Sequence, residues 1–308
     1  MKIVFMGTPD YSVKTLEKLI NSHHEVVGVF AQPDKPVGRK RILTAPPVKV
    51  CAQNCGIPVF QPSTLRDGEA LKIISDLSPD IIVVVAYGKI LPKEILDYPK
   101  YGCVNGHASI LPRHRGASPI QWAICCGDTE TGVTVMKMDE GMDTGDIIEV
   151  VKTAIGKTET AEELFERLSH ISADLMLKVI DDIEEGKASF KKQPDEGVTY
   201  APIIKKEMAH LDFTQDAETL CNMVRGFYSW PCAYTVLCGK RVKIIEAEAV
   251  GYKSGECGTV VENRGELIVS CGNDTALKLL TVQPEGSKAM TAAMMLNGNR
   301  IPLGEKAQ

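Results

Sequence analysis

No apolar run in the 308-residue sequence approaches the roughly 20 residues that cross a membrane. The long apolar runs, such as Ile81–Ala86, stop far short of that length. The N-terminus meets Gly7, Pro9 and Asp10 within its first ten residues, which is typical of a first strand and its turn rather than of a signal peptide. We therefore expect no membrane partner and a cytoplasmic location.

Closely paired cysteines are also absent. The chain has ten cysteines, but none are spaced C-x-x-C and most have apolar neighbours. Without a secretory signal, this usage predicts reduced thiols and no metal site. Cys103 lies close to Asn105, but nothing nearby marks it as a nucleophile, and we interpret it as a packing residue.

Nucleotide-binding fingerprints are missing too. GTPDYS follows the first predicted strand, but Gly7 lacks the second and third glycines of G-x-G-x-x-G, and no Walker A sequence occurs. We therefore expect no tightly bound cofactor. The net charge is −5, which excludes a protein that is basic overall. A nucleic-acid partner would need local basic patches.

The composition is that of a soluble globular protein, with 44% hydrophobic and 24% charged residues, and the length allows two domains. Strand and helix signals alternate in the first half. Strands are predicted at 2–6, 25–30, 57–60, 81–86 and 131–138, and helices at 11–21, 48–55, 71–77, 118–127 and 160–186. This alternation predicts an α/β fold with a doubly wound, mostly parallel sheet.

The pattern changes after residue 187, where a mixed segment with Pro194 and Pro202 indicates a linker. A helix at 216–227 and five short β-rich runs follow, at 233–237, 241–250, 258–263, 266–270 and 276–284. These runs predict a small, OB-like C-terminal β-barrel. The expected division is an α/β domain at 1–188, a linker at 189–206 and a barrel domain at 207–308.

One constellation of residues indicates catalysis. Asn105 has an amide that can stabilise an oxyanion, and His107 can exchange a proton near neutral pH. On an extended segment both side chains point to the same side. A carboxylate from DEGMDTGD, at 139–146, can orient the histidine. An isolated N-x-H pair is more often structural, but this complete order of residues is much more specific, although spacing alone leaves Asp139, Asp143 and Asp146 as alternatives.

Two groups of cations are candidates for nucleic-acid contact. Four lie within seven positions of a loop punctuated by proline and glycine: Lys35, Arg39, Lys40 and Arg41. The second group is Lys240, Arg241 and Lys243, of which the last two share a strand face. A solvated loop and a solvated strand face are the alternative interpretations. Arginine can bind phosphate or base edges with two donors, and Arg39 is the preferred contact.

The sequence resembles the methionyl-tRNA formyltransferase family over nearly its whole length. The resemblance rests on FMGTPDYS at 5–12, VFAQPDKPVGRK at 29–40, VNGHASILPRHRGASPIQWAI at 104–124, GDTETGVTVMKMDEGMDTGDI at 127–147 and RGFYSWPCAYT at 225–235. Two positions depart from the family. Gly106 replaces a bulkier apolar residue, and GRKRIL lacks a second glycine often found after its arginine.

The resemblance implies formyl transfer from 10-formyltetrahydrofolate, as a co-substrate, to the α-amine of methionine on initiator Met-tRNA. It implies Asn105, His107 and Asp143 as the catalytic residues. Folate is expected at Val85, Ala86, Tyr87, Gly88, Ser109, Ile110, Leu111, Pro112, Asp139 and Gly141. The tRNA is expected at Lys35, Arg39, Lys40, Arg41, Lys240, Arg241 and Lys243, and the protein is expected to be a monomer.

Two other functions remain open. A small-amine or sugar-nucleotide formyltransferase would use the same donor and the same three catalytic residues. A catalytically silent nucleic-acid-binding protein would not need Asn105, His107 and Asp143 together. The loop at 29–41 and the C-terminal domain favour a tRNA substrate, and the three catalytic residues favour an enzyme.

Overall fold

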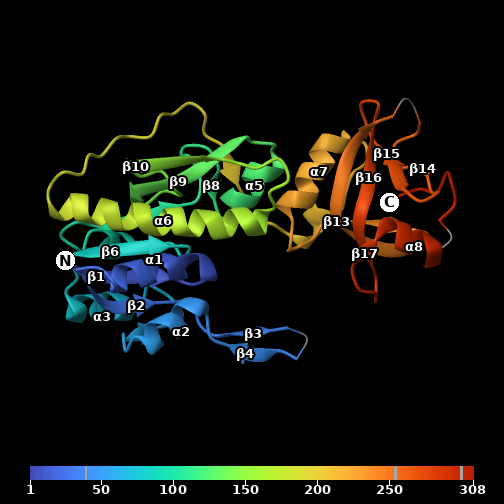
Figure 1. The fold of residues 1–308 in the computed structure, drawn as a ribbon. Helices are drawn as coiled ribbons and strands as arrows, with labels where there is room; N and C mark the ends of the chain where they lie inside the picture. Colours follow the sequence, from blue (N-terminus) through green and yellow to red (C-terminus); the bar gives the residue numbers. More distant parts are fainter. Residues whose placement is uncertain (39, 253–254, 299–300) are drawn as a thin grey trace. The chain divides into compact units, whose positions relative to one another are not determined.

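The computed structural model describes residues 1–38, 40–252, 255–298 and 301–308. The chain forms two compact units (Figure 1). Unit 1 comprises Met1–Pro119, Glu130–Ala154 and Phe165–Ala201, and unit 2 comprises Ile120–Thr129, Ile155–Leu164 and Pro202–Gln308. Among the described residues, no helix has both the length and the apolar character needed to cross a membrane.

A seven-stranded sheet forms the centre of unit 1, in the order β10–β9–β7–β6–β1–β2–β5. Neighbours from β7 to β5 pair in parallel, whereas β9 pairs antiparallel with both β7 and β10. The sheet is therefore mostly parallel, as predicted. Its strands are β1 (Lys2–Gly7), β2 (Glu25–Phe30), β5 (Val59–Phe60), β6 (Ile81–Val85), β7 (Cys103–His107), β9 (Glu130–Lys137) and β10 (Ile147–Ala154).

Helices cover both faces of this sheet. One face packs against α3 (Glu69–Leu77) and α4 (Lys93–Leu96), whose apolar side chains share a buried cluster with alternate residues of β1 and β6. The other face packs against α1 (Asp10–Ile20) and α6 (Ala161–Glu184), which meet where the Tyr11 ring lies edge-on to Phe165 at 5.2 Å. Two further helices are α2 (Pro47–Asn54) in unit 1 and α5 (Pro119–Cys125), which lies mostly in unit 2. Burial on both faces explains the near-continuous apolar run of β6.

Several elements of unit 1 are absent from the sequence-based expectation, among them α4 and β7. The predicted loop around Lys35 is an antiparallel hairpin of β3 (Lys35–Val37) and β4 (Ile42–Thr44). The edge strand β10 was not predicted. Finally, β8 (Arg115–Gly116) pairs in parallel with β11 (Tyr200–Ala201), which belongs to the expected linker. Paired backbone therefore extends into a segment whose composition indicated a loop.

Unit 2 is built on a six-stranded antiparallel sheet in the order β12–β13–β16–β15–β14, with β17 also paired to β16. The first five strands match the five predicted β-rich runs. They are β12 (Tyr234–Leu237), β13 (Lys240–Gly251), β14 (Val260–Glu262), β15 (Leu267–Ser270) and β16 (Thr275–Pro284), with β17 at Met290–Thr291. The helices are a 3₁₀ turn at Lys206–Ala209, α7 (Ala217–Gly226) and α8 (Ala292–Gly298).

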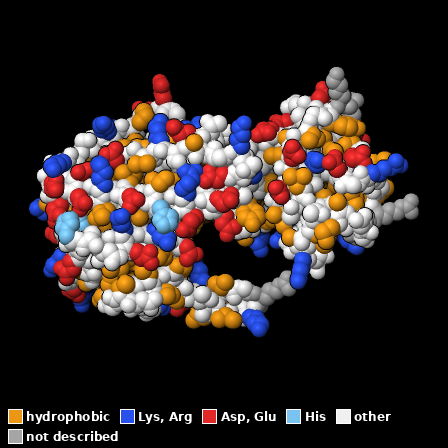
Figure 2. Space-filling view, viewed as in Figure 1, with side chains coloured by type: hydrophobic (Ala, Val, Ile, Leu, Met, Phe, Trp, Pro, Cys, Tyr) orange, Lys and Arg blue, Asp and Glu red, His pale blue; other side chains and the backbone are white. Residues whose placement is uncertain are grey.

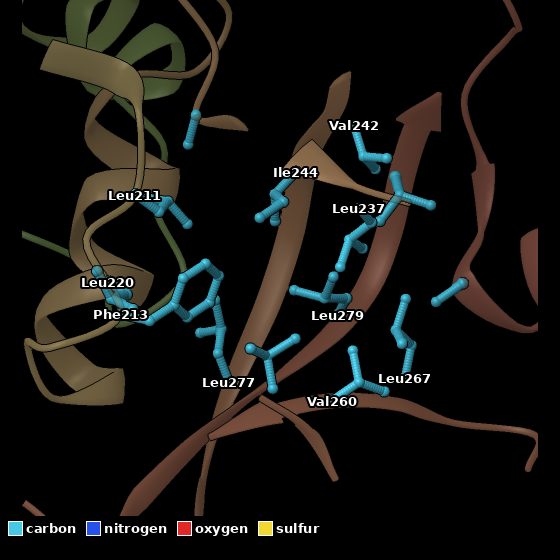
Figure 3. Close-up of a cluster of buried hydrophobic side chains, with 14 of the residues drawn as sticks. Leu211, Phe213, Leu220, Leu237, Val242, Ile244, Val260, Leu267, Leu277 and Leu279 are labelled. Carbon is cyan, nitrogen blue, oxygen red and sulfur yellow. The ribbon is translucent and has the colours of Figure 1, made fainter. Parts of the chain in front are cut away.

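The core of unit 2 lies between α7 and the inner face of this sheet (Figure 3). Leu220 of α7 and Phe213 face Leu277 of β16, and all three side chains are almost completely buried. Each fully buried side chain of this size contributes about 1.5–3 kcal/mol. The alternation of buried and exposed residues along β12–β16 thus fixes which face of the sheet is inside.

The last residues of the chain pair with both outer strands of the unit 2 sheet. Val236 of β12 and Gln308 exchange two backbone hydrogen bonds, of 2.7 and 3.0 Å. Val260 of β14 donates its N–H to the Glu305 carbonyl at 2.9 Å. Residues 305–308 therefore bridge the two strands that would otherwise form the open edges of the sheet.

Candidate functional site

Asn105 and His107 project from the same face of β7, and both are more than 90% buried. Cys103, two residues earlier on this face, joins the cluster of α3 and α4. Burial raises the pKa of the Cys103 thiol to about 12, so this sulfur stays protonated at neutral pH. Its interpretation as a packing residue agrees with its environment, and the polar chemistry of the strand rests on Asn105 and His107.

Asp143 reaches both residues from the loop that joins β9 to β10. The Asn105 amide nitrogen donates to Asp143 Oδ1 at 3.4 Å, and Asp143 Oδ2 lies 3.6 Å from His107 Nδ1. The structure therefore brings together the three residues that the sequence motifs select, although 36 residues separate His107 from Asp143 in the chain.

The second ring nitrogen of His107 is also engaged. Nε2 lies 2.9 Å from the backbone carbonyl of His114. A carbonyl oxygen can only accept, so Nε2 must hold a hydrogen. Nδ1, on the Asp143 side, is consequently the ring nitrogen that this contact leaves available.

The backbone around Asp143 is constrained. Its φ of +54° is left-handed, a conformation that costs a non-glycine residue about 1–3 kcal/mol and concentrates at functional sites. The Gly116 N–H donates to Asp143 Oδ2 at 2.8 Å. At Gly145, an added Cβ would lie only 1.7 Å from the Lys137 carbonyl oxygen, so this position accepts no side chain without movement of the loop.

Asp139 and Asp146, the two alternatives to Asp143, have different contacts. Asp139 accepts hydrogen bonds inside the loop, from the Gly141 N–H at 3.0 Å and the Thr144 hydroxyl at 2.6 Å. The backbone carbonyl of Asp146 accepts from the Lys137 N–H at 2.9 Å, where the loop rejoins the sheet. Asp143 is thus the one of the three whose carboxylate lies beside Asn105 and His107.

A cleft of about 150 Å³ adjoins this cluster. One wall is the segment after β6, formed by Lys89, Ile90 and Leu91, and the other is formed by Met136, Met138 and the loop of residues 139–145. Asp143 belongs both to the cleft wall and to the polar cluster. An apolar cleft with a few polar groups at one end has the general form of a small-molecule site.

The residues expected to bind folate divide into two groups. Asp139 and Gly141 line the cleft, and Ala86 and Gly88 are exposed just before its first wall. The side chains of Val85, Tyr87, Ser109 and Leu111 are instead buried, and Ile110 and Pro112 are half-buried. The Ser109 hydroxyl donates to the Arg113 carbonyl at 2.6 Å, so it shapes the turn after His107.

Several lining residues were missed from the sequence. Lys89, Ile90, Leu91 and three methionines, at 136, 138 and 142, form much of the cleft. The available signal was the density of methionines in VMKMDEGMD, because flexible thioethers adapt to irregular ligand shapes. Gln193, which contacts the Asp143 loop, had no signal, since its side chain acts across 50 residues of sequence.

Gly106, between the two catalytic candidates, lies against α6. An added Cβ would meet Ser172 Oγ at 3.1 Å and Met176 Cε at 3.2 Å. The helix therefore fills the space that the bulkier family residue would occupy. This departure from the family pattern leaves the opposite face of β7, with Asn105 and His107, unchanged.

Most of the candidate nucleic-acid cations that the structure describes are exposed. Lys35, Lys40 and Arg41 are exposed on the β3–β4 hairpin, and Arg39 lies outside the described residues. Figure 2 shows hydrophobic side chains together with blue cations along this hairpin. In unit 2, Lys240 and Arg241 are exposed and Lys243 is half-buried. The Arg241 guanidinium lies 3.6 Å from the centre of the Tyr234 ring.

Comparison with known proteins agrees with this geometry. Residues 1–180 match the family model of formyl transferases, and residues 203–300 match the model of the formyl transferase C-terminal domain. An N-formyltransferase from Helicobacter canadensis, solved with folinic acid and dTDP-3-aminofucose, shares the fold with a TM-score of 0.69 at 20% identity, over 91% of this chain and 98% of that one. Fold and site thus define the class as formyl transferases.

Sequence identity places the chain in a narrower family within this class. The methionyl-tRNA formyltransferase of Bacillus thuringiensis is 45% identical over 99% of this chain and 98% of its own length. A solved methionyl-tRNA formyltransferase from Clostridium thermocellum is 22% identical, covers 90% of this chain and 98% of its own, and has a TM-score of 0.57. The chain belongs to the methionyl-tRNA formyltransferase family.

Proposed function

We propose that the protein transfers the formyl group of 10-formyltetrahydrofolate to the α-amine of methionine on initiator Met-tRNA. The observation that supports this reaction best is the meeting of Asn105, His107 and Asp143 at the end of a cleft, in a chain 45% identical to methionyl-tRNA formyltransferases. The amine nitrogen forms a bond to the formyl carbon, and the bond from that carbon to the folate nitrogen breaks. The amine loses a proton and the folate nitrogen gains one.

Asn105 and His107 stabilise the oxyanion that develops on the formyl oxygen. The Asn105 amide is a permanent donor. Because His107 Nε2 is bonded to the His114 carbonyl, only Nδ1 remains to donate to substrate. The Asp143 carboxylate, 3.6 Å from Nδ1, stabilises positive charge that develops on the ring during the reaction. Loss of one such donor typically slows a reaction about 10²–10³-fold.

The folate donor occupies the cleft beside Asp143. Its flat rings require apolar contact, which Ile90, Leu91 and the three methionines offer, and its polar edges require hydrogen-bonding groups, which the backbone of residues 139–145 offers. Ala86 and Gly88 remain candidate contacts at the entrance. Val85, Tyr87, Ser109 and Leu111 support this site from the buried side.

The tRNA is bound by cations on both units. In unit 1 the β3–β4 hairpin presents Lys35, Lys40 and Arg41, and in unit 2 β13 presents Lys240, Arg241 and Lys243. Phosphate contacts of this kind supply affinity without reading sequence. Arg39 keeps its proposed role as the main contact of the hairpin, although it lies outside the described residues.

We infer that unit 2 is an OB-like barrel, and the bridging of the outer strands of its antiparallel sheet by residues 305–308 supports this inference. The proposed organisation is a catalytic domain at 1–188, a connecting segment at 189–206 and a tRNA-binding barrel at 207–308. OB folds commonly bind nucleic acids, which supports this role.

The test is to incubate the purified protein with 10-formyltetrahydrofolate and Met-tRNA and to measure formyl-Met-tRNA. An amino-sugar nucleotide and a free amino acid serve as parallel acceptors, since the Helicobacter canadensis protein was solved with such a sugar nucleotide. We expect formylation of Met-tRNA only. Formylation of the sugar nucleotide without formyl-Met-tRNA would overturn the proposal.

A further inference from the structure

Residues 191–201, which we call the strap, contact the surroundings of the candidate active site at both ends and through Gln193. Lys191 and Ile147 exchange two backbone hydrogen bonds of 2.8 Å, next to the end of the Asp143 loop. At the other end, the Ala117 and Ser118 amides donate to the Ala201 carbonyl at 2.9 and 3.2 Å. All of these residues belong to unit 1. The strap is therefore an ordered part of the site's surroundings, although its sequence indicated a linker.

Gln193 is the third residue of the strap, and its side-chain amide forms hydrogen bonds on two sides. Its amide nitrogen donates to the backbone carbonyls of Asp143 and Gly145, both at 2.8 Å. Its amide oxygen accepts from Arg115, from Nε at 3.1 Å and from a terminal nitrogen at 2.6 Å. Because arginine can only donate, the oxygen must face Arg115 and the nitrogen must face the loop. The amide orientation is thus fixed by its partners.

The hydrogen bonds of Gln193 hold the backbone that carries the Asp143 carboxylate. Asp143 has a left-handed φ of +54°, a conformation that few non-glycine residues adopt and that aspartate tolerates. Gln193 binds the carbonyl of this residue and the carbonyl two residues later. Arg115, which anchors Gln193, directly precedes Gly116, whose N–H binds the Asp143 carboxylate. One connected set of bonds therefore fixes both the backbone and the side chain of Asp143.

The strap also supports the histidine. The Thr199 hydroxyl accepts from the His114 N–H at 2.8 Å, and the Thr199 carbonyl accepts from the Arg115 N–H at 2.9 Å. His114 has a left-handed φ of +56°, and its carbonyl accepts from His107 Nε2. The strap thus touches the immediate partners of both His107 and Asp143.

We propose that Gln193 is a positioning residue for formyl transfer, whose amide holds the Asp143 loop so that the Asp143 carboxylate stays beside His107. This inference rests on the proposed function, since Asp143 must take part in catalysis for its position to matter. Gln193 lies outside the cleft lining and acts through Asp143. A displacement of about 1 Å in a reacting group can cost about 100-fold in rate.

The test is a double-mutant cycle on the rate constant of formyl transfer. This rate constant is measured in single turnovers with saturating 10-formyltetrahydrofolate and Met-tRNA. We expect Gln193→Ala to lower the rate by about 10–100-fold in the wild-type background. In the Asp143→Asn background the same change should cost no more than about twofold, which is the scatter of independent effects. An equal loss in both backgrounds would show a general structural role and overturn the proposal.

Gln193→Glu separates the two sets of bonds. A glutamate still accepts from Arg115 but cannot donate to the carbonyls of Asp143 and Gly145. We expect a loss of kcat similar to that of Gln193→Ala, with circular dichroism and Tm showing a folded protein. Full kcat in folded Gln193→Glu would show that the donations to the loop are dispensable, and would also overturn the proposal.

Gln61 offers a matched control in the same unit. Its amide nitrogen donates to the Gln32 carbonyl and to Asp34 Oδ1, both at 2.8 Å, and its oxygen accepts from Lys49 at 2.8 Å. Any effect of Gln61→Ala on the rate should be equal in the two backgrounds. Formylation of Met-tRNA by the wild-type protein is measured first, so that failure of the proposed function is distinguished from additive behaviour of Gln193→Ala.

Discussion

The loop of residues 139–146 and the β3–β4 hairpin are two candidate substrate contacts of unit 1, and they are built in opposite ways. The loop is bonded to segments far away in sequence, at Gly116 and Gln193. The hairpin is paired along its own two strands, and Val37, Ile42 and Leu43 are 56%, 62% and 67% exposed.

This difference follows from the task that we assign to each segment. A reacting carboxylate must keep its position to within a fraction of an ångström, which requires rotamers and backbone held by several partners. A contact with a large polyanion depends on exposed cations and on adaptable surface, and tolerates movement. The loop should therefore respond to small changes with loss of rate, and the hairpin with loss of affinity.

The largest effect should come from the catalytic cluster itself. We expect His107→Ala and Asp143→Ala each to lower kcat by about 10²–10⁴-fold, because positioned acid–base groups contribute that much. Formylation of Met-tRNA gives the rate, and circular dichroism with Tm tests the fold. Near-normal turnover in either folded variant would remove that residue from the proposed mechanism.

Gly145→Ala should move the same loop while leaving its polar side chains in place. The added Cβ would lie 1.7 Å from the Lys137 carbonyl oxygen in strand β9, so the loop must move. We expect up to about a 100-fold loss of kcat. Gly186→Ala is the matched control, since nothing lies within 4 Å of an added Cβ there. Its positive φ of +69° predicts some loss of Tm but an unchanged rate.

Changes in the hairpin should weaken tRNA binding and leave the chemical step intact. We expect the double variant Lys40→Ala with Arg41→Ala to lower kcat/KM for Met-tRNA and to flatten its dependence on log salt by about one unit per lost phosphate contact. The rate at saturating tRNA should be retained. Lys187→Ala, at an exposed cation paired with Glu185, is the control. If the slope of kcat/KM against log salt is the same in the wild type and the double variant, the hairpin is a solvated surface and not a phosphate contact.

Arg39→Ala adds a question of discrimination, although this residue lies outside the described part of the hairpin. A loss of kcat/KM confined to initiator Met-tRNA would make Arg39 a reader of the initiator. An equal loss for initiator and elongator Met-tRNA would make it a phosphate contact only.

The smallest effect is expected for Asp139→Ala. Its carboxylate accepts from Gly141 and Thr144 within the loop, and one such bond contributes about 0.5–1.5 kcal/mol. We expect less than about a tenfold change in kcat. A loss as large as that of Asp143→Ala, in a folded protein, would transfer the catalytic role to Asp139.

Much of the fold could be predicted because its signals are local. The apolar run at Ile81 predicts a strand buried on both faces, and the five short β-rich runs of unit 2 are bounded by glycines. The edge strand β10 was missed because it is packed less completely and contains charged residues, so its apolar signal is weak. The hairpin was missed because its strands have only three residues each and its apolar side chains face solvent.

The candidate site also has residues that the sequence predicts and residues that it does not. Asn105, His107 and Asp143 have a recognisable order in the sequence, and the structure brings them together. The contacts of Gln193 could not be predicted, because a single glutamine in a polar segment has no periodicity and its partners lie 48–78 residues away. Tertiary hydrogen bonds of this kind leave no local pattern.

The bridging of β12 and β14 by residues 305–308 also has a consequence for solubility. Unpaired strand edges recruit edges of other molecules, and natural β proteins cover them. Here four residues cover two edges at once, through Gln308 on one side and Glu305 on the other. A protein that loses residues 305–308 would expose two unpaired strand edges. Its first visible defect should be self-association, before any change in formylation.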